Sequence, residues 1–362
     1  MKRIYGIFRG FPGLGRVSSG IALLKEFQKK GYEIAAISYF QGTEALYRQG
    51  IPMLFEYSID TSDITSIGIN PITGFATHII EKILEDKPDV VIIDGEPLLQ
   101  STLGDVYPKE KIISLLNPSD LHNETLAEST IRFYHKNYLS ASNAIVHGVG
   151  VRNTVVKENE CNINYIPTIL RQEIIDFIKD DCPSNRIVGI LGGGSVNSSN
   201  MFLSSTIEMG KKIASIARKM QQYSFEIYCN DKNIKNEIEK SSVLPANFCI
   251  TASYTAPSQM YKGAKLVIAR AGRNVVSELL YLNIPGLLIA TNGDYRSKEQ
   301  EKNIDSMIQE SNNLFDKFYL LDEDEILIEK IMNMIDIMPK EGDFNAGNSK
   351  AIEIIEKVID NT

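Results

Sequence analysis

The sequence predicts an α/β protein of two domains, each built on a mainly parallel sheet with helices on both faces. Short, continuously apolar segments alternate with amphipathic helical patterns along the chain, which is typical of buried parallel strands joined by helices. A polar, proline-containing stretch at 166–185 interrupts the alternation, which then starts again. At 362 residues the chain is also longer than one hydrophobic core usually supports.

The N-terminal half contains a regular series of predicted elements. Ile21, Leu24 and Phe27 recur at helical spacing and predict a helix over Ser19–Lys30. Another helix is predicted over Ala76–Asp86. The predicted strands are Ile4–Phe8, Glu33–Tyr39, Val90–Asp94, Lys111–Leu116 and Ala144–His147.

The C-terminal half repeats the pattern, with a long helix predicted to end at Met220. A final helix, Ser349–Ile359, has Ile352, Ile355 and Val358 on one side and therefore needs a partner surface, for which the first domain is a candidate. The predicted strands are Arg186–Leu191, Phe225–Cys229, Phe248–Thr251, Leu266–Ala269 and Gly286–Ala290.

These patterns define the expected domain boundaries. A first Rossmann-like domain is expected at 1–165, a linker at 166–185, a second Rossmann-like domain at 186–345 and a C-terminal helical segment at 346–362. Ligands of such sheets bind beyond the carboxyl ends of the strands, so both domains are expected to present their loops to a cleft.

Composition and charge argue against several classes of function. The net charge of −8 and the pI of about 5.3 disfavour broad nucleic-acid binding. No stretch approaches the roughly 20 apolar residues of a membrane-spanning helix. The four cysteines, at 161, 182, 229 and 249, lack metal-ligand and redox-motif spacing, which is typical of reduced thiols in a cytoplasmic protein.

A first glycine-rich loop, at 10–16, follows the first strand and precedes the first helix. Its glycines permit a tight turn and a close approach to a ligand. Gly13, Gly15 and Gly20 do not have the spacing of a dinucleotide-binding fingerprint, and no acidic residue ends the second strand, so NAD binding is disfavoured. No Walker lysine follows, which disfavours a P-loop NTPase.

A strand, turn and helix at 265–280 form a candidate anion site. The turn is Ala271–Gly272, and the helix that follows contains Glu278. The N–H groups and positive dipole of a helix start can hold a diphosphate, and a carboxylate along the same helix could accept hydrogen bonds from an attached ribose. The alternative is an ordinary turn of an α/β fold, with Glu278 in solvent.

Two further polar segments follow strands of the second domain. A triple-glycine loop with Ser195 and Asn197 could cradle phosphate, although a plain turn before a helix is the alternative. The segment 289–303 contains amide and carboxylate side chains that suit sugar hydroxyls. Taken alone, this last segment is better explained as a solvated loop and helix start.

The ordered set of these features resembles the donor-binding half of a GT-B glycosyltransferase. It is similar to the family 28 group, which includes the transferase that attaches N-acetylglucosamine to lipid I, and to related UDP-glycosyltransferases. The resemblance covers most of the chain and is strongest over 186–305. It implies the GT-B fold, in which two Rossmann-like domains face a cleft, the first binding the acceptor and the second the nucleotide sugar.

The resemblance also implies roles for residues of the second domain. Ser195 with its glycine loop and the turn Ala271–Gly272 would contact the diphosphate. Glu278 would hold the ribose hydroxyls, the loop around Tyr254 would seat the base, and Gln300 would contact the donor sugar. The full set of implied donor-binding residues is Gly193, Gly194, Ser195, Asn197, Tyr254, Ala271, Gly272, Arg273, Glu278, Glu299, Gln300 and Asn303.

The first domain departs from the family at one position. The resemblance assigns Gly13, Leu14 and Gly15 to the acceptor loop, but relatives often have histidine, a candidate base, where this chain has Arg16. A guanidinium stays protonated at physiological pH, so it cannot take a proton. Arg16 could instead bind phosphate or steady a negative leaving group.

The catalytic base is therefore expected elsewhere in the first domain. Asp94 and Glu96 follow the third strand, and Asp120 and His122 follow the fourth. Groups at the carboxyl ends of parallel strands face the expected ligand site, where they could deprotonate an acceptor hydroxyl or simply bind it. The alternatives are that Asp94 caps the following helix and that His122 is a surface loop residue.

The expected function is transfer of a sugar from a nucleotide diphosphate sugar, with UDP as the expected nucleotide, to a hydroxyl acceptor. The resemblance implies an inverting displacement that needs no metal and no cofactor, since the nucleotide sugar is a substrate. Hydrolysis or 2-epimerisation of a nucleotide sugar, or non-catalytic binding of one, are the alternatives. The acceptor is either a small molecule or lipid-linked, so peripheral association with a membrane stays open for this cytoplasmic protein.

Overall fold

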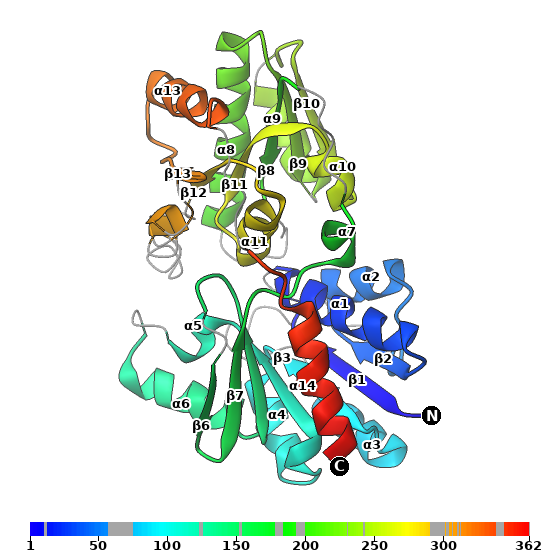
Figure 1. Cartoon of the computed structure of the whole chain (residues 1–362). Helices are drawn as coiled ribbons and strands as arrows, with labels where there is room; N and C mark the ends of the chain where they lie inside the picture. Colours follow the sequence, from blue (N-terminus) through cyan, green and yellow to red (C-terminus); the bar gives the residue numbers. More distant parts are fainter. Residues whose placement is uncertain are drawn as a thin grey trace. The chain divides into compact units, whose positions relative to one another are not determined.

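A computed structural model gives the fold (Figure 1). It describes residues 1–10, 13–56, 75–122, 126–151, 154–177, 184–192, 200–229, 231–241, 243–289, 301, 304–305, 307–309, 311, 313–337 and 344–361. The chain divides into two compact units. The first unit comprises Met1–Arg171 with Ala346–Thr362, and the second comprises Gln172–Asn345.

The described part of the first unit contains a seven-stranded sheet in the order β2-β1-β3-β4-β5-β7-β6. All neighbouring strands are parallel except β6 and β7, which form an antiparallel hairpin at one edge. The strands are β1 (Arg3–Phe8), β2 (Glu33–Ile37), β3 (Val90–Asp94), β4 (Ile112–Leu116), β5 (Asn143–His147), β6 (Val155–Glu158) and β7 (Cys161–Ile166).

Helices cover both faces of this sheet. Successive side chains of a strand point to opposite faces, so Ile4 and Ile92 belong to one apolar cluster, whereas Tyr5 and Ile93 belong to another. The helices of the first unit are α1 (Gly15–Lys29), α2 (Gln41–Arg48), α3 (Ala76–Asp86), α4 (Pro97–Gly104), α5 (Pro118–Leu121), α6 (Glu128–Tyr138) and α14 (Asn348–Asn361), with a 3-10 turn at Lys109–Lys111.

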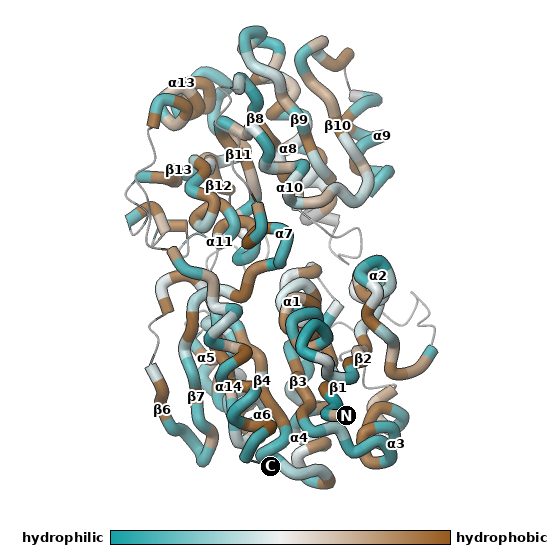
Figure 2. The backbone as a smooth tube through the Cα atoms, turned by 45° about the vertical axis from the view of Figure 1, so that its right-hand side comes forward, coloured by the Kyte–Doolittle hydropathy of each residue, from teal (hydrophilic) through white to brown (hydrophobic). Residues whose placement is uncertain are grey.

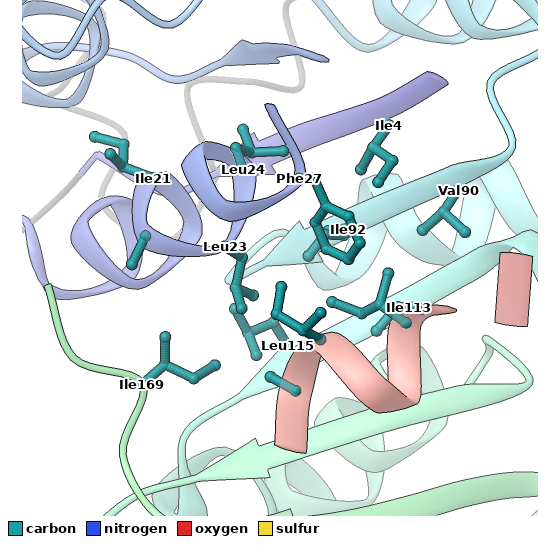
Figure 3. Close-up of a cluster of buried hydrophobic side chains, with 14 of the residues drawn as sticks. Ile4, Ile21, Leu23, Leu24, Phe27, Val90, Ile92, Ile113, Leu115 and Ile169 are labelled. Carbon is teal, nitrogen blue, oxygen red and sulfur yellow. The ribbon is translucent and has the colours of Figure 1, made fainter. Parts of the chain in front are cut away.

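One face of the sheet is covered by α1 and by the C-terminal helix α14. Leu23, Leu24 and Phe27 of α1 lie over Ile4, Ile92 and the neighbouring strand residues, as Figure 3 shows. The helix α14 adds the buried Ile352, Ile355 and Val358, so the end of the chain packs within the first unit. In Figure 2, strands β3 and β4 are largely brown, which matches their burial on both faces.

The described part of the second unit contains a six-stranded, fully parallel sheet in the order β10-β9-β8-β11-β12-β13. Helices α8, α9 and α13 pack on one of its faces in a single apolar cluster. The strands are β8 (Arg186–Ile190), β9 (Ser224–Cys229), β10 (Phe248–Ala252), β11 (Ala264–Arg270), β12 (Gly286–Ile289) and β13 (Phe315–Lys317). The helices are α7 (Gln172–Ile175), α8 (Asn200–Lys219), α9 (Lys232–Ser241), α10 (Pro257–Tyr261), α11 (Arg273–Leu282) and α13 (Asp324–Ile335).

The predicted fold class is confirmed: both units are α/β, with mostly parallel sheets. The hairpin β6–β7 and the edge strand β13 were not predicted from the sequence. The stretch expected as a linker contains the end of β7 and the short helix α7. Within the described helices, none has the length and apolar composition needed to cross a membrane.

Candidate functional site

The first unit brings charged residues together at one edge of its sheet. Arg9 follows β1, Asp94 ends β3, Glu96 lies two residues further on, and Asp120 lies in the short helix after β4. Arg16 is the second residue of α1, which starts from the loop after β1. Since β1, β3 and β4 are adjacent and parallel, their carboxyl ends bring these five side chains to the same edge.

Arg16 is bound by two of the carboxylates. Its Nη2 donates to Oδ1 and Oδ2 of Asp120 at 2.7 and 2.9 Å, and its Nη1 donates to Oδ1 of Asp94. The carboxylate of Asp120 also accepts from the backbone N–H of Asn117 at 2.8 Å, within the capping box that starts α5. The cap holds Asp120 in place and turns its carboxylate towards the guanidinium.

Glu96 is bound by a different pair of residues. Its Oε1 accepts a hydrogen bond of 2.7 Å from the hydroxyl of Tyr39, which follows β2, and lies 3.7 Å from Nε of Arg9. Asp94 and Glu96 have no exposed side-chain surface, whereas the side chains of Arg16 and Asp120 are 11% and 12% exposed. Of the three carboxylates, Asp120 is therefore the one that solvent or a ligand can reach directly.

Gly95, between the two buried acids, allows the arginines to pack closely. Its φ is +87°, a backbone conformation that glycine adopts without steric cost. A Cβ atom at this position would lie 2.7 Å from Cδ of Arg16 and 2.8 Å from Cβ of Arg9. The Asp94–Gly95–Glu96 sequence therefore combines two acids with the space that their arginine partners occupy.

The side-chain pKa values of Asp120 and Glu96 are shifted in opposite directions. Burial disfavours ionisation of both acids, but the guanidinium of Arg16 overcomes it at Asp120, whose pKa lies below its ordinary value. At Glu96, burial dominates over Arg9 and Tyr39 and raises the pKa to about 6. Asp120 is thus held as a carboxylate at neutral pH, while Glu96 titrates close to the physiological range.

His122 contacts none of the residues described in these ion pairs, and its described partners are elsewhere in the first unit. Its Nε2 is 3.2 Å from the hydroxyl of Tyr165 on β7, and its exposed ring is nearly parallel to that of Tyr165. Its ring also meets that of His135 edge-on. The structure therefore brings Arg16, Asp94 and Asp120 together, but directs His122 towards β7.

The predicted acceptor loop leads into α1. Leu14 is the residue before the helix and packs against the core, while Gly15 is its first residue. Among the described residues, no atom lies within 4 Å of a Cβ placed on Gly13, so this position borders open space. Gly20 has a packing role instead, because a Cβ there would lie 2.4 Å from the ring of Phe8.

In the second unit, the turn Ala271–Gly272 connects β11 to α11. Ala271 is buried and bonded to β12 through its backbone N–H, whereas Gly272 is exposed. Gly272 occupies the N-cap position of α11 and has no side chain with which to cap the helix. No described atom lies within 4 Å of a Cβ placed on Gly272, and the first residue of the helix is Arg273.

Glu278 is not a solvated helix residue. It lies on the buried face of α11 with 1% of its surface exposed, and its Oε2 accepts a hydrogen bond of 2.7 Å from the hydroxyl of Tyr261. Tyr261 is the last residue of α10 and is also 1% exposed. A buried carboxylate on a helix that starts at an exposed turn is a group that the apolar core alone does not require.

Arg270, the last residue of β11, links that turn to the second glycine-rich loop. Its Nε donates to the carbonyl of Leu191 at 3.1 Å, and its Nη2 donates to the hydroxyls of Ser205 and Thr206 on α8, both at 2.9 Å. Burial lowers the pKa of the Arg270 guanidinium to about 10, so it stays protonated at neutral pH. Gly192 packs against the same side chain.

The remaining predicted donor residues are only partly described. Tyr254 is 43% exposed in the loop after β10. The other positions lie outside the described residues; they are Gly193, Gly194, Ser195, Asn197, Glu299, Gln300 and Asn303.

Comparison with known proteins identifies a family-specific domain in the second half of the chain. Residues 193–361 match the glycosyltransferase family 28 C-terminal domain. The second half of the chain therefore contains a family 28 domain, and the expected resemblance to GT-B glycosyltransferases of this group is confirmed. The chain is thus a hexosyltransferase, and the predicted family and class of enzyme are confirmed.

Individual relatives extend the match over both halves of this glycosyltransferase. The chain is 23% identical to the UDP-N-acetylglucosamine--N-acetylmuramyl-(pentapeptide) pyrophosphoryl-undecaprenol N-acetylglucosamine transferase of Staphylococcus aureus (strain bovine RF122 / ET3-1), over 96% of this chain and 94% of the relative. It also resembles the crystal structure of Acinetobacter baumannii MurG, with a TM-score of 0.58 and 15% identity over 99% of this chain and 100% of that one. The Methanocaldococcus jannaschii UDP-GlcNAc 2-epimerase has a similar fold, with a TM-score of 0.61 and 13% identity over 98% and 99% of the two chains.

The sequence analysis did not single out several residues that make these contacts, and the ones that bind predicted site residues or adjoin the predicted loops are Arg9, Tyr39, Tyr261 and Arg270. Arg9, Tyr39 and Arg270 stand at or just after the carboxyl ends of parallel strands, which is the signal that could have found them. Tyr261 ends a helix of five residues, where no periodic pattern indicates the direction of a side chain.

Proposed function

We propose that this glycosyltransferase moves N-acetylglucosamine from UDP-N-acetylglucosamine to a hydroxyl acceptor with inversion at the anomeric carbon. The family 28 match over 193–361 supports this proposal most strongly, because it covers the unit with the exposed helix start at Gly272 and the buried Glu278. We infer the donor from the Staphylococcus aureus relative, whose name specifies UDP-N-acetylglucosamine as its donor.

The proposed donor site uses groups of the second unit. The start of α11 at Gly272, together with Arg273, binds the diphosphate, and Glu278 accepts hydrogen bonds from the ribose hydroxyls. Ser195 with its glycine loop, Tyr254, Gln300, Glu299 and Asn303 complete the site as the family resemblance implies.

The proposed reaction is a single displacement. The acceptor oxygen forms a bond to the anomeric carbon as the bond from that carbon to the β-phosphate oxygen breaks, and UDP departs with the bonding electron pair. Asp120 takes the proton of the attacking hydroxyl, since Arg16 keeps it ionised and its side chain is partly exposed. Asp94 and Glu96 are positioning residues in this scheme, because both are fully buried against the arginines.

The net charge of the cluster around Arg16 indicates which part of the acceptor binds there. Within the described residues, Arg9 and Arg16 face the carboxylates of Asp94, Glu96 and Asp120, so the acids are in excess. Such a cluster suits a neutral, hydroxyl-bearing sugar better than a phosphate group. We therefore place the acceptor sugar, rather than any diphosphate attached to it, at Asp120.

No metal and no cofactor take part in the proposed reaction. The negative charge that develops on the departing diphosphate is stabilised by the start of α11 and by arginine, which take the role that a metal ion would otherwise have. Turnover in the presence of EDTA equal to that without it is the expected result, and loss of turnover that Mg²⁺ or Mn²⁺ restores would contradict the proposal.

Nucleotide-sugar 2-epimerisation is the competing function, because an epimerase shares the fold. A panel of nucleotide sugars tests both. UDP and UDP-N-acetylglucosamine should raise the thermal midpoint of the protein more than ADP or GDP compounds, since binding to the native state stabilises it. The absence of a shift with every nucleotide would contradict the whole scheme. Conversion of UDP-N-acetylglucosamine to its 2-epimer without an acceptor would favour the alternative.

A further inference from the structure

The hydrogen bond from Tyr261 to Glu278 joins two parts of the second unit that are separate in the sequence. Tyr261 ends α10, the short helix that follows the loop containing Tyr254. Glu278 lies on α11, under two turns from Gly272. A single contact of 2.7 Å therefore connects the segment after the predicted base loop with the helix of the predicted phosphate turn.

Hydrogen bonds hold the backbone on both sides of Tyr261. Arg186, at the start of β8, donates from Nη1 to the carbonyls of Met260 and Lys262 at 2.9 and 2.5 Å, on either side of Tyr261. The same guanidinium donates to the carboxylate of Glu226 at 2.6 Å. Arg186 of β8, which is itself bound to Glu226 of β9, thus anchors the backbone around Tyr261. The tyrosine hydroxyl therefore has a defined position from which it can orient the carboxylate of Glu278.

The partner is a carboxylate whose orientation matters. Both side chains are 1% exposed, so the hydrogen bond between them is shielded from bulk water. With Oε2 engaged by the tyrosine, the plane of the Glu278 carboxylate is set and Oε1 is directed by that constraint. A carboxylate accepts hydrogen bonds, and one whose plane is set presents its oxygens to the two adjacent hydroxyls of a ribose in a defined direction.

We propose that Tyr261 is a positioning residue that fixes the Glu278 carboxylate for recognition of a ribose diol, and so makes the enzyme selective for ribonucleotides over 2′-deoxyribonucleotides. This inference rests on the proposed function, in which Glu278 binds the donor ribose. It adds a specificity role for Tyr261, which acts through Glu278 without touching the ligand.

The test compares binding of UDP and 2′-deoxy-UDP to the full-length wild type and Tyr261→Phe by isothermal titration calorimetry. The substitution removes one hydroxyl and keeps the ring. Wild type should bind UDP about 10-fold or more tightly than 2′-deoxy-UDP, and Tyr261→Phe should lose about 5- to 10-fold for UDP but about 2-fold or less for 2′-deoxy-UDP. An equal loss for both ligands, no loss for either, or no discrimination by the wild type would overturn the inference.

Tyr107→Phe is the matched control. Tyr107 lies in the first unit and is 7% exposed, and its hydroxyl donates to the carbonyl of Pro88, so its removal deletes a comparable buried hydrogen bond. Tyr107→Phe should leave the ratio of the two affinities unchanged. A similar change of the ratio in Tyr107→Phe would show that general loosening is the cause, which contradicts a specific role of Tyr261.

A double-mutant cycle with Glu278→Gln tests whether Tyr261 acts through Glu278. In the Glu278→Gln background, Tyr261→Phe should change UDP affinity by about 2-fold or less, because the carboxylate to be oriented is gone. Retention of the full effect would contradict the inference. If wild type binds neither nucleotide, the proposed function itself fails; if it binds UDP and the ratio is unaffected in Tyr261→Phe, only the role of Tyr261 fails.

Discussion

The guanidinium of Arg16 binds both carboxylate oxygens of Asp120, at 2.7 and 2.9 Å, through a single nitrogen. Its other terminal nitrogen binds Asp94, so one side chain of α1 links the end of β3 to the short helix α5 that follows β4. This arrangement gives Arg16 a structural role at the position where the family resemblance implies histidine: Arg16 organises the carboxylates and does not take a proton.

Replacement of Arg16 by histidine should therefore destabilise the protein. Arg16→His removes the fork that binds Asp94 and Asp120 and leaves buried negative charge uncompensated. The free energy of unfolding should fall by about 3–5 kcal/mol, as for other broken buried pairs. Urea denaturation measures this loss, and Arg16→Lys, which keeps the charge, should lose less. A His variant as stable as the wild type would contradict the structural role of Arg16.

Asp120 should be required for turnover but not for donor binding. Asp120→Asn keeps the size of the side chain and removes its ability to take a proton, so kcat should fall by about 10²- to 10⁴-fold. The affinity for UDP should be unchanged within a factor of about 2. His122→Ala is the comparison, since His122 contacts Tyr165 instead of the ion pairs, and it should keep most of its activity. The reverse order of the two variants would make His122 the base.

Glu96 should produce a stability change with pH. Its pKa is 4.5 in the reference state and about 6 in the folded protein, so the folded state binds the proton more tightly between these values. The contribution is fully present below pH 4.5 and is lost as the pH rises through 6, which amounts to about 2 kcal/mol. Glu96→Gln lacks this dependence. The difference in unfolding free energy between wild type and Glu96→Gln, measured at pH 4.5 and pH 7.5, should change by this amount, and a constant difference would contradict it.

Gly95 should tolerate no side chain. Gly95→Ala places a methyl group 2.7 Å from Cδ of Arg16 at a φ of +87°, so both the clash and the backbone conformation are unfavourable. The backbone cost alone is about 1–3 kcal/mol, measurable by urea denaturation. Gly31→Ala is the control: it has a φ of +86°, and no described atom lies within 4 Å of its Cβ position. Equal losses in the two variants would show that the contact with the arginines does not matter.

Substitution of Arg270 should change the KM for the donor more than the KM for the acceptor. Arg270→Lys keeps the charge but cannot reach Leu191 and the hydroxyls of Ser205 and Thr206 together, so the loop after β8 loses its connection to the turn after β11. The KM for UDP-N-acetylglucosamine should rise about 10-fold or more, which corresponds to the loss of one charge-assisted hydrogen bond. Steady-state kinetics at saturating acceptor measure this. An unchanged donor KM would separate Arg270 from the donor site.

The sequence predicted the buried strands well because a strand covered on both faces needs a continuous apolar segment, as in β3 and β4. The hairpin β6–β7 was not predicted, because Val155 and Val156 are exposed and give no apolar strand pattern. In addition, its turn residues, Asn159 and Glu160, adopt positive φ without the glycine that usually signals such a turn.

The candidate site was predictable only in part. Positions after strand ends indicated Asp94, Glu96 and Asp120, because parallel strands direct their carboxyl ends to one edge. The sequence could not show that Asp94 and Glu96 are fully buried or that Arg9 faces Glu96, since both depend on the pairing of β1 with β3. It also left Glu278 between two interpretations, and only its burial against Tyr261 distinguishes a shielded carboxylate from a solvated one.

The most direct test of the account is a label-transfer assay with UDP-N-acetylglucosamine labelled in the sugar. The full-length protein is incubated without acceptor, with a panel of soluble saccharides, and with vesicles that contain polyprenyl-diphosphate-linked sugars. We expect the label to move to one acceptor class in a β-linkage, with one UDP released for each sugar transferred and no reaction without acceptor. Free N-acetylglucosamine or a 2-epimer formed in the acceptor-free sample would contradict the proposed transfer.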